Sequence, residues 1–339
     1  MSTALVTGAT GFIGHHVARD LLEHGWTVRA LIRPASLGDR RWPAEAQPIA
    51  GELLDPAAII EAARGCDAIV HVAAHYSLAR HQAQDVERTN IGGTANVIAA
   101  AKARGARLVH TSSVATIGIP GDGTPGDEDT PLDPAIVIGA YKRSKLASEW
   151  MVQQAARDGL WATIVNPSAP VGPGDWKPTP TGRIVRDFLR GRMRAYVDTG
   201  LNLVDVRDVA AGHRLALEHG TPGRRYILGN QNMTLREILE TLGQVSSRPA
   251  PTRKIPHPVA IGFAALSELV EGRLLHREPF APLDGALMAR KRMYYSSRRA
   301  IDELGLPQSS VTHALRDAVD WWQGPLTPDR RLRPTETAR

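Results

Sequence analysis

The chain has 339 residues, 42% of them apolar, and a formal net charge of +6, which is ordinary for a globular enzyme with one large α/β domain and a smaller lobe. Its basic residues are scattered, whereas a nucleic-acid-binding surface needs a clustered stripe, so we expect no nucleic-acid partner. No apolar run is long enough to span a membrane, no signal peptide precedes the first strand, and the single cysteine, Cys66, cannot form an internal disulfide, so the expected location is the cytoplasm.

The first predicted strand covers residues 4–6, and a helix is expected from residue 15 to residue 24, where apolar side chains recur at helical spacing. Gly8 permits a tight turn between them, Gly11 lets the backbone approach a pyrophosphate, and Gly14 lets the helix pack on its strand. The N-terminus of the helix offers free N–H groups to the phosphates. The turn therefore predicts a dinucleotide-binding site, with a glycine-rich turn without a ligand as the alternative. Its residues are Gly8, Thr10, Gly11, Phe12, Ile13 and Gly14.

The second predicted strand, residues 27–32, is followed by Arg33. In dinucleotide-binding folds the residue that closes this strand lies beside the adenosine ribose. An acid there accepts from the free 2′-hydroxyl of NAD, whereas an arginine pairs with the 2′-phosphate of NADP. Arg33 therefore favours NADP(H) over NAD(H), and the alternative is a solvated arginine.

The next two strands are predicted at residues 49–55 and 68–74. The end of the first would border the adenine, and the small residues at the end of the second would let the cofactor cross the strand ends. His71, inside the second of these strands, is expected to be a core histidine. The residues expected along the cofactor here are Glu52, Leu53, Val72, Ala73 and Ala74.

A helix predicted at residues 89–103 and a strand at residues 107–113 continue the alternation, and residues 119–134 are expected to form a surface loop. Short apolar strands that alternate with helices specify a parallel sheet covered by helices on both faces. The predicted fold class is therefore α/β, a Rossmann-type doubly wound sheet.

A helix is predicted to begin at Tyr141, with Leu146, Trp150 and Val152 on its buried face. Tyr141 and Lys145 are four residues apart and hence one turn from each other on the same side. A lysine ammonium near a phenol favours the phenolate and lowers its pKa, so the tyrosine can exchange a proton with an alcohol or carbonyl. Ser113, at the end of its strand, could hydrogen-bond the same substrate oxygen.

The strand predicted at residues 161–167 ends at Pro167, which is expected near the cofactor. Residues 177–183 are either a linker or a substrate loop, because they follow a strand end where ligands bind. Residues 203–209 and a last strand near residue 226 would return the chain to the sheet, and the remainder is mainly helical. No metal site is expected. The candidate substrate residues are His75, Lys177, Thr179, Arg183 and Asn202.

This organisation predicts a dinucleotide-binding domain of residues 1–168, to which residues 203–230 return. A small, mainly helical substrate-binding lobe is predicted from residues 169–202 and 231–324. Residues 325–339, which are polar and rich in proline and arginine, are predicted to be a flexible tail.

The glycine turn, the Thr111-Ser112-Ser113 strand end and the Tyr141-x-x-x-Lys145 motif together resemble the extended short-chain dehydrogenase/reductase family, in the branch with dihydroflavonol reductases and sugar-nucleotide epimerases. Residues 166–173, 177–183, 195–202 and 225–229 are similar to a subfamily called hopanoid-associated sugar epimerases. The resemblance implies that Ser113, Tyr141 and Lys145 form the catalytic set and that Lys145 also holds the nicotinamide ribose. Two positions depart from the family pattern, Glu52 where an aspartate is usual and Asp205 where many relatives have histidine.

Three classes of function are compatible with these features. The first is an NADP(H)-dependent oxidoreductase or epimerase, monomeric or homodimeric, acting on a secondary alcohol or ketone of a sugar-like or hopanoid-linked polyol. Arg33 favours net reduction, as in a dihydroflavonol-reductase-like enzyme, because an epimerase only recycles its cofactor. The second is a dinucleotide-binding regulator without turnover. The third is a lipid-handling protein peripheral to the inner membrane face, motivated by the apolar run of residues 258–266 and the basic tail, although a core helix explains that run equally well.

Overall fold

The computed structural model describes residues 2–39, 41–77, 80–137, 139–274 and 283–328, and most of the predicted flexible tail, from residue 329 on, lies outside them. The chain forms two compact units. Unit 1 contains Met1–Ser168, Arg207–Leu228 and Tyr295–Pro307, and unit 2 contains Ala169–Val206, Gly229–Tyr294 and Gln308–Arg339.

Unit 1 is built on a seven-stranded sheet in which every neighbouring pair of strands is parallel. The strand order is β3-β2-β1-β4-β5-β6-β9. Successive strands are added on one side of β1 and then, from β4 on, on its other side, and this change of side marks a doubly wound fold. The predicted Rossmann-type sheet is therefore confirmed. The strands are β1 (Thr3–Thr7), β2 (Thr27–Ile32), β3 (Gln47–Ala50), β4 (Ala68–His71), β5 (Arg107–Thr111), β6 (Ala162–Pro167) and β9 (Arg225–Leu228).

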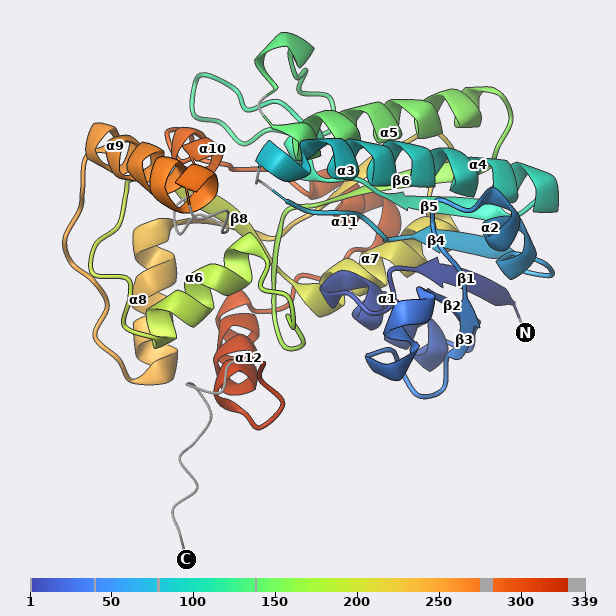
Figure 1. Cartoon of the computed structure of the whole chain (residues 1–339), viewed down its shortest axis with the longest axis horizontal. Coiled ribbons are helices and arrows are strands. Elements are labelled where there is room, and N and C mark those ends of the chain that lie inside the picture. The colour runs from blue at the N-terminus through green and yellow to red at the C-terminus, as the bar shows by residue number, and fades with distance from the viewer. Residues whose placement is uncertain (1, 40, 78–79, 138, 275–282, 329–339) are drawn as a thin grey trace, which may run out of the picture. The chain divides into compact units, whose positions relative to one another are not determined.

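Helices cover both faces of this sheet (Figure 1). One face carries α1 (Phe12–Glu23) and α7 (Val206–His219), which are joined by an ion pair of 2.8 Å between Asp20 and Arg214. The other face carries α2 (Pro56–Ala62), α4 (Gly93–Arg104) and α5 (Ala140–Arg157). The short helix α3 (Ala83–Glu87) runs into α4 through a π-helical turn, Arg88–Gly92.

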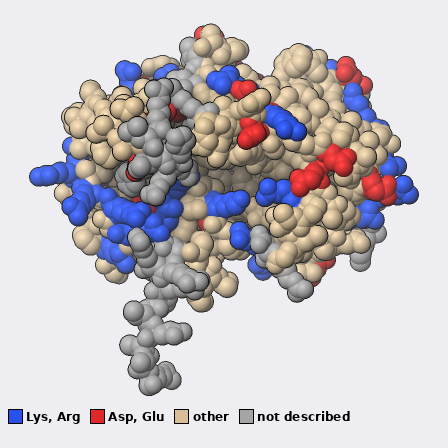
Figure 2. Space-filling view, viewed as in Figure 1, with Lys and Arg blue, Asp and Glu red and all other residues tan. Residues whose placement is uncertain are grey.

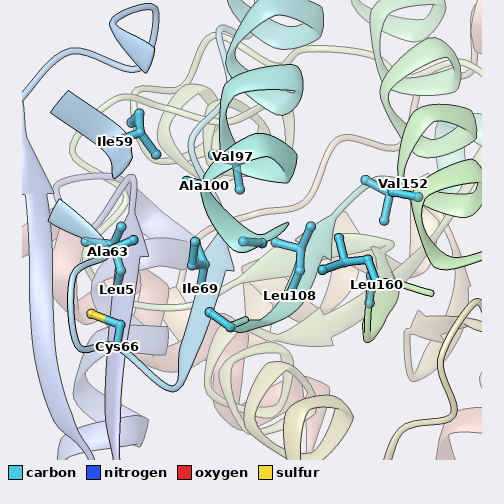
Figure 3. Packing of buried hydrophobic residues seen from close by; sticks show 14 of the residues in the cluster. Leu5, Ile59, Ala63, Cys66, Ile69, Val97, Ala100, Leu108, Val152 and Leu160 are labelled. Carbon is cyan, nitrogen blue, oxygen red and sulfur yellow. The ribbon is translucent and has the colours of Figure 1, made fainter. Parts of the chain in front are cut away.

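One hydrophobic cluster of unit 1 lies between the sheet and this second helical face, and buried residues of α1 such as Val17 and Leu21 pack outside it. Figure 3 shows side chains of β1, β4 and β5, among them Leu5, Ile69 and Leu108, packed against α2, α4 and α5. Cys66 is buried at the edge of the same cluster, and burial raises the pKa of its thiol. The expectation that it is a small packed residue is confirmed.

Two of the predicted strands are longer than the strands of the structure. The strand predicted at residues 49–55 is β3 (Gln47–Ala50), because Asp55 instead accepts the N–H groups of Ala57 and Ala58 and begins α2. The strand predicted at residues 68–74 ends at His71. His71 itself is buried, with Thr7 Oγ1 at 2.8 Å and Thr94 Oγ1 at 3.3 Å, and is a core histidine as expected.

The prediction for the buried face of α5 is wrong at Trp150, whereas Val152 is buried as predicted and Leu146 is partly buried. Trp150 is 60% exposed, whereas the inward positions include Ser144, Lys145, Ser148 and Glu149. Apolar spacing failed here because this stretch of the helix packs through hydrogen bonds. Ser148 donates to the main-chain oxygen of Asn90 at 3.1 Å, and Asn90 donates to Ser144 at 2.9 Å.

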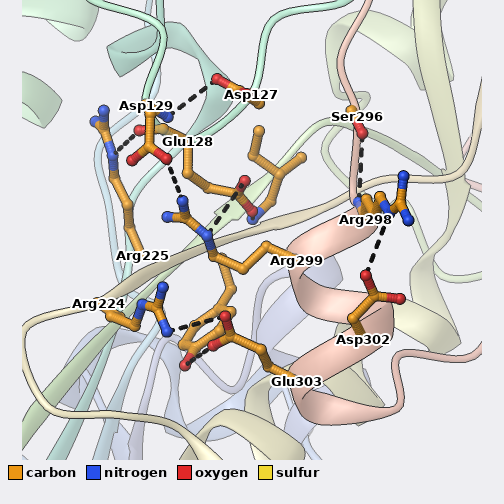
Figure 4. Close-up of polar contacts among 12 residues, drawn as sticks. Asp127, Glu128, Asp129, Arg224, Arg225, Ser296, Arg298, Arg299, Asp302 and Glu303 are labelled. Atoms are coloured by element: carbon orange, nitrogen blue, oxygen red, sulfur yellow. Dashed lines mark hydrogen bonds and ion pairs between the residues drawn. The ribbon is translucent and has the colours of Figure 1, made fainter.

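Residues 295–307 belong to unit 1, although the sequence analysis placed them in the substrate-binding lobe. They contain α11 (Arg298–Leu304), which packs on the edge strand β9. Figure 4 shows the polar contacts that hold it. Arg299 pairs with Asp129 at 2.5 Å and with Glu128, and Glu303 pairs with Arg224 at 2.9 Å. Apolar periodicity carries no information about such ion pairs.

Unit 2 has its own three-stranded sheet with the order β10-β8-β7. Strand β8 is antiparallel to β10 and parallel to β7, so residues 203–205 of the predicted returning segment lie in this small sheet, whereas residues 207–228 belong to unit 1. The strands are β7 (Ala169–Val171), β8 (Gly200–Asp205) and β10 (Gln231–Thr234), and the helices are α6 (Pro180–Leu189), α8 (Leu235–Ser246), α9 (His257–Ser267), η6 (Glu268–Leu274), α10 (Leu283–Met288) and α12 (Val311–Gln323).

The core of unit 2 joins α6, α8 and α12. Phe188, Leu239 and Trp322 are among its buried side chains. Thr234 caps α8 by accepting the N–H of Glu237 while the Glu237 carboxylate accepts the N–H of Thr234, which is a complete capping box.

Candidate active site

The glycine turn joins β1 to α1, and at two of its positions only glycine fits. Gly8 has φ +78°, and a Cβ there would lie 2.7 Å from the main-chain nitrogen of Ala73. A Cβ on Gly14 would lie 2.1 Å from the carbonyl oxygen of Gly8. The turn therefore packs directly on the end of β4 and on the first turn of α1.

The same turn leaves the N-terminus of α1 open. Gly11 is the N-cap residue and offers no capping side chain, and the first turn contains no acidic residue. The first N–H groups of a helix have no acceptor within it, so they can bind an anion. A Cβ on Gly11 would meet the Gly8 oxygen at 3.2 Å and no other atom within 4 Å. Thr10, Phe12 and Ile13 complete this turn, and the open cradle fits a pyrophosphate.

The residues expected at the adenosine end lie where the neighbouring strands finish. Arg33 directly follows β2 and is exposed, and its carbonyl oxygen accepts the Ser36 N–H at 2.8 Å. Glu52 is exposed after β3. Leu53 is partly buried, and its carbonyl oxygen accepts a hydrogen bond of 3.0 Å from Asn96.

The ends of β4 and β6 lie further along the same edge of the sheet, because all the strands run parallel. After β4, the Val72 N–H donates to the carbonyl of Thr7, and the Ala73 N–H donates to its hydroxyl at 3.1 Å. Ala74 is exposed, and Pro167 is buried opposite Leu228 at the end of β6. Parallel sheets bind dinucleotides along this edge.

Tyr141 lies in the first turn of α5. Burial raises the pKa of its phenol to about 12, and a hydrogen bond with Ser113 opposes the shift. The sequence analysis predicted instead that Lys145 lowers this pKa. That prediction is contradicted, because desolvation of the phenol dominates and the Ser113 contact, not Lys145, acts to lower the pKa.

Lys145 lies one turn after Tyr141 and is buried. Its Nζ donates to the carbonyl oxygen of Thr111, at the end of β5, at 2.8 Å. Burial lowers the pKa of the ammonium to about 8, and the charge of Glu149, one turn further along α5, acts in the opposite direction. The ammonium therefore loses its proton at a lower pH than an ordinary lysine.

Ser113 is held on both its side chain and its main chain. Its Oγ accepts the Ala115 N–H at 3.1 Å. Its carbonyl oxygen accepts hydrogen bonds from Thr116 at 2.8 Å and from Asn166 at 3.1 Å. The hydroxyl is thereby fixed at the end of β5, and it contacts the phenol of Tyr141. The structure thus brings the predicted Ser113, Tyr141 and Lys145 together within unit 1.

Three residues near this set were not singled out from the sequence. Glu149 is buried and accepts hydrogen bonds from Ser112 at 2.5 Å and from other neighbours. Asn90, in the π-helical turn, binds both the N–H and the carbonyl oxygen of His75 through its amide. The ring of Tyr76 lies 4.6 Å from that of Tyr141 in an edge contact. Of the three, only Glu149 could have been found from the sequence, because it follows Lys145 by four residues and therefore lies on the same side of α5.

The predicted substrate residues fall in different units. His75 belongs to unit 1, whereas the other four belong to unit 2. There Lys177 is exposed, and Arg183 donates to the Pro178 carbonyl at 3.3 Å. Thr179 caps α6 and donates to the buried carboxylate of Asp175. The Asn202 amide bonds Asn230 and Asn232 in the pairing of β8 with β10.

The comparison with protein families identifies the family of this chain. Residues 4–229 match the model described as the NAD dependent epimerase/dehydratase family. The chain belongs to this family. Within it, the chain is similar to a Synechocystis protein provisionally named dihydroflavonol 4-reductase, at 47% identity over 94% of both chains. It is also 35% identical to sterol demethylase protein B of Methylococcus capsulatus, over 95% of this chain and 98% of that one.

A solved structure has the same fold. The crystal structure of a protein called gox2253 matches with a TM-score of 0.84 and 40% identity, covering 95% of this chain and 98% of that one. The chain is thus an enzyme of the epimerase/dehydratase family, an oxidoreductase or epimerase of the extended short-chain dehydrogenase/reductase type, and it uses a nicotinamide dinucleotide. The glycine turn and the open N-terminus of α1 fit that group.

Proposed function

We propose that this protein is an NADP(H)-dependent oxidoreductase acting on a secondary alcohol or ketone of a sugar-like or polyol substrate. The observation that carries the proposal is the partly buried Tyr141 side chain, which is hydrogen-bonded to Ser113 and lies one helical turn from Lys145. This set provides a proton donor, an oxygen-binding hydroxyl and a cation at one edge of the sheet. A dinucleotide-binding regulator would have no need of all three.

The proposed roles follow from the positions of these groups. The bound dinucleotide supplies the hydride chemistry. Tyr141 gives its proton to the substrate oxygen during reduction, and Ser113 donates a hydrogen bond to the same oxygen. Lys145 holds its ammonium beside the strand ends, where the nicotinamide ribose would bind. Glycines 8, 11 and 14 and the first turn of α1 hold the pyrophosphate.

The preference for NADP(H) rests on Arg33. This side chain is exposed directly after β2, at the position that lies beside the adenosine ribose in dinucleotide-binding folds. Pairing with a 2′-phosphate is a charge-assisted contact worth about 1.5–3 kcal/mol. Fluorescence titration should therefore show that NADPH binds at least about tenfold more tightly than NADH, and that Arg33→Ala removes the difference. Equal affinities in the wild type would refute the preference.

Net reduction is favoured over epimerisation. The preference for NADP(H) that rests on Arg33 supports net reduction, because an epimerase only recycles its cofactor. The name of the Synechocystis relative also indicates a reductase, and a dihydroflavonol-reductase-like ketone or aldehyde reductase is the second candidate. The Methylococcus relative is named for sterols, which supports a substrate linked to a polycyclic lipid such as a hopanoid polyol.

Substrate binding is assigned to unit 2, with Lys177, Thr179 and Arg183 as contacts. Arg183→Ala should raise KM and leave NADPH affinity unchanged. Arg186→Ala on the same helix is the matched control, because Arg186 is paired with Asp187 at 3.0 Å. Equal effects of the two changes on KM would remove Arg183 from the site. The proposed enzyme is cytoplasmic, a monomer or a homodimer, and contacts the inner membrane face at its periphery.

The decisive experiment incubates the purified protein with NADPH and a panel of sugar ketones and hopanoid polyol ketones. Cofactor absorbance and product stereochemistry are recorded together. Stoichiometric consumption of NADPH is expected with a reductase. Inversion of an alcohol centre without net consumption would establish an epimerase instead. Failure of every substrate to react, with NADPH still bound, would favour the regulator.

A further inference from the structure

One helical face of unit 2 exposes large apolar side chains. On α9, Val259 is 59% exposed, Phe263 56% and Leu266 59%, and on the following η6 helix Val270 is 39% exposed. These four positions are spaced by four, three and four residues, so they form one continuous stripe along the helix. We call this set the α9 stripe. Leu269 widens it, whereas Ala264 and Ser267 on the other side of the helix are buried.

The acidic residues of this region turn away from the stripe. Glu268 accepts the Leu283 N–H at 3.2 Å, and Glu271 accepts the Ser267 hydroxyl at 2.6 Å. Both glutamates are partly buried in these contacts. The exposed face of the helix therefore presents apolar side chains, and neither Glu268 nor Glu271 adds a carboxylate to it.

Basic residues gather at the N-terminal end of the stripe. His257, the first residue of α9, contacts the carbonyl oxygen of Ala289 at 3.0 Å, which brings the segment after α10 to this end. Figure 2 shows Lys and Arg side chains gathered on the left of the view, below the part of unit 2 where Figure 1 labels α9. The basic cluster consists of the exposed residues Arg253, Lys254, Arg290, Lys291 and Arg292.

The basic cluster keeps an excess of positive charge. Asp198 pairs with Lys254 at 2.8 Å and with Arg292 at 3.2 Å, and Glu237 also interacts electrostatically with Arg292. The basic cluster thus contains five cations, and the two carboxylates of Asp198 and Glu237 neutralise only part of their charge. An apolar helical face bordered by such a cluster has the pattern of a helix that lies in the interface of an anionic bilayer.

We propose that the α9 stripe and the basic cluster dock this protein on an anionic lipid bilayer, with α9 lying in the plane of the interface. This names the surface for the peripheral contact proposed above and does not depend on which substrate is turned over. The helix does not cross the bilayer, since none of the described helices combines the length and apolar character needed for a span.

A second copy of the chain fits this surface less well. A two-fold interface would place the same patch of both copies face to face. Opposite the basic cluster, such an interface would place either the same cluster or the far end of the stripe, where Glu268 and Glu271 are held in their own hydrogen bonds, so it offers no anionic partner. A bilayer that contains anionic lipid presents the opposite charge to the same side chains, while its hydrocarbon accepts the apolar stripe.

The test is vesicle sedimentation of the full chain, with vesicles of phosphatidylcholine alone and of phosphatidylcholine mixed with phosphatidylglycerol. Wild type should bind the anionic vesicles and be released by high salt, which shortens electrostatic interactions. Phe263→Ser combined with Leu266→Ser should weaken binding by at least about tenfold. Arg290→Glu combined with Lys291→Glu should remove the preference for anionic vesicles.

Matched controls separate docking from folding and from activity. Trp150→Ser combined with Leu326→Ser removes two apolar side chains outside the stripe that are 60% and 74% exposed, and it should leave binding unchanged. NADPH affinity and the melting temperature should be the same in all variants, so loss of docking and loss of the proposed activity are distinguishable. The proposal is overturned if wild type does not bind anionic vesicles, or if the stripe variant binds them equally well. A wild-type dimer that the stripe variant converts to monomer would identify a protein interface instead.

Discussion

Glu149 on α5 and Arg225 on β9 form an ion pair at 2.9 Å in which the carboxylate is almost fully buried. The second carboxylate oxygen of Glu149 accepts hydrogen bonds from Ser112, Thr116 and Asn166. A buried carboxylate without such partners would be strongly destabilising. Because Thr116 and Asn166 also bind the carbonyl of Ser113, Glu149 links the end of β5 to the helix that carries Tyr141 and Lys145.

This arrangement predicts a pH-dependent effect of Glu149→Gln. Glutamine keeps the shape of the side chain but removes the charge that raises the pKa of Lys145, which burial otherwise lowers to about 8. The ammonium should then lose its proton at a lower pH. Affinity for NADH, measured by fluorescence, should fall as the pH rises through about 8 in wild type and at lower pH in the variant. NADH is the suitable probe because it has no titrating 2′-phosphate.

Lys145→Met is the control for this prediction. It should bind NADH weakly and without the pH-dependent step. If Glu149→Gln shifts the melting temperature but leaves the midpoint of the NADH titration where it is in wild type, Glu149 has a structural role only.

The parts of the fold that the sequence predicted depend on local patterns. The glycine turn, the alternation of strands with helices and the step from Tyr141 to Lys145 are all set by spacing within one or two elements. Family membership and the nicotinamide dinucleotide follow from the same motifs. Sequence spacing therefore located the residues of the candidate site.

The parts that it missed depend on tertiary contacts. Trp150 is exposed because the neighbouring inward positions of α5 are polar and hydrogen-bonded, and residues 295–307 join unit 1 through ion pairs such as that of Arg299 with Asp129. The pKa of Tyr141 was predicted in the wrong direction because burial of the phenol cannot be seen in a four-residue spacing.

Two similar substitutions in the glycine turn should have different effects. Gly14→Ala should mainly lower stability, whereas Gly11→Ala should mainly weaken dinucleotide binding. Gly14→Ala would place a methyl group 2.1 Å from the Gly8 oxygen and should lower the free energy of unfolding by about 1–3 kcal/mol. Gly11→Ala meets only one atom, at 3.2 Å, and should cost less than about 1 kcal/mol while weakening NADPH binding, because the methyl group enters the pyrophosphate cradle. Urea unfolding and NADPH titration measure the two quantities.

Gly38→Ala is the neutral reference for this pair, since a Cβ at Gly38 would meet no atom within 4 Å. A Gly11→Ala variant with wild-type affinity for both NADPH and NADH would place the pyrophosphate elsewhere.

Three buried histidines predict a loss of stability in acid. Burial lowers the pKa of His71 to about 3, that of His213 to about 4, and that of His110 well below 6.5. The unfolded chain takes up these protons first, near pH 6.5, so the stability is complete above that pH and falls as the pH decreases towards 3. Urea unfolding between pH 7 and pH 4 should show a loss of several kcal/mol.

Substitution separates the contributions of two of these histidines. No described residue hydrogen-bonds the ring of His110, so His110→Leu should keep or raise stability at pH 7 and reduce its pH dependence. His71→Leu removes the ring that contacts the hydroxyls of Thr7 and Thr94 and should cost about 1–3 kcal/mol. Equal losses in the two variants at pH 7 would mean that the His110 ring does have a partner.

The last prediction concerns the proton of Tyr141. Because burial holds the phenol protonated, with a pKa of about 12, the ultraviolet difference titration between wild type and Tyr141→Phe should show one tyrosine that ionises near pH 12. Ser113→Ala removes the hydrogen bond that lowers this pKa and should move the ionisation to higher pH. In the reduction of a ketone, Tyr141→Phe should lose turnover by about 10²–10⁴-fold, since the general acid is gone, while NADPH affinity is retained. Ser113→Ala should lower the rate with little change in NADPH affinity, because its hydroxyl, which also accepts the Ala115 N–H, contacts the phenol and is proposed to bind the substrate oxygen rather than the dinucleotide. A Tyr141→Phe enzyme with wild-type turnover would exclude Tyr141 as the proton donor, and an ionisation near pH 10 would mean that the phenol is exposed to solvent.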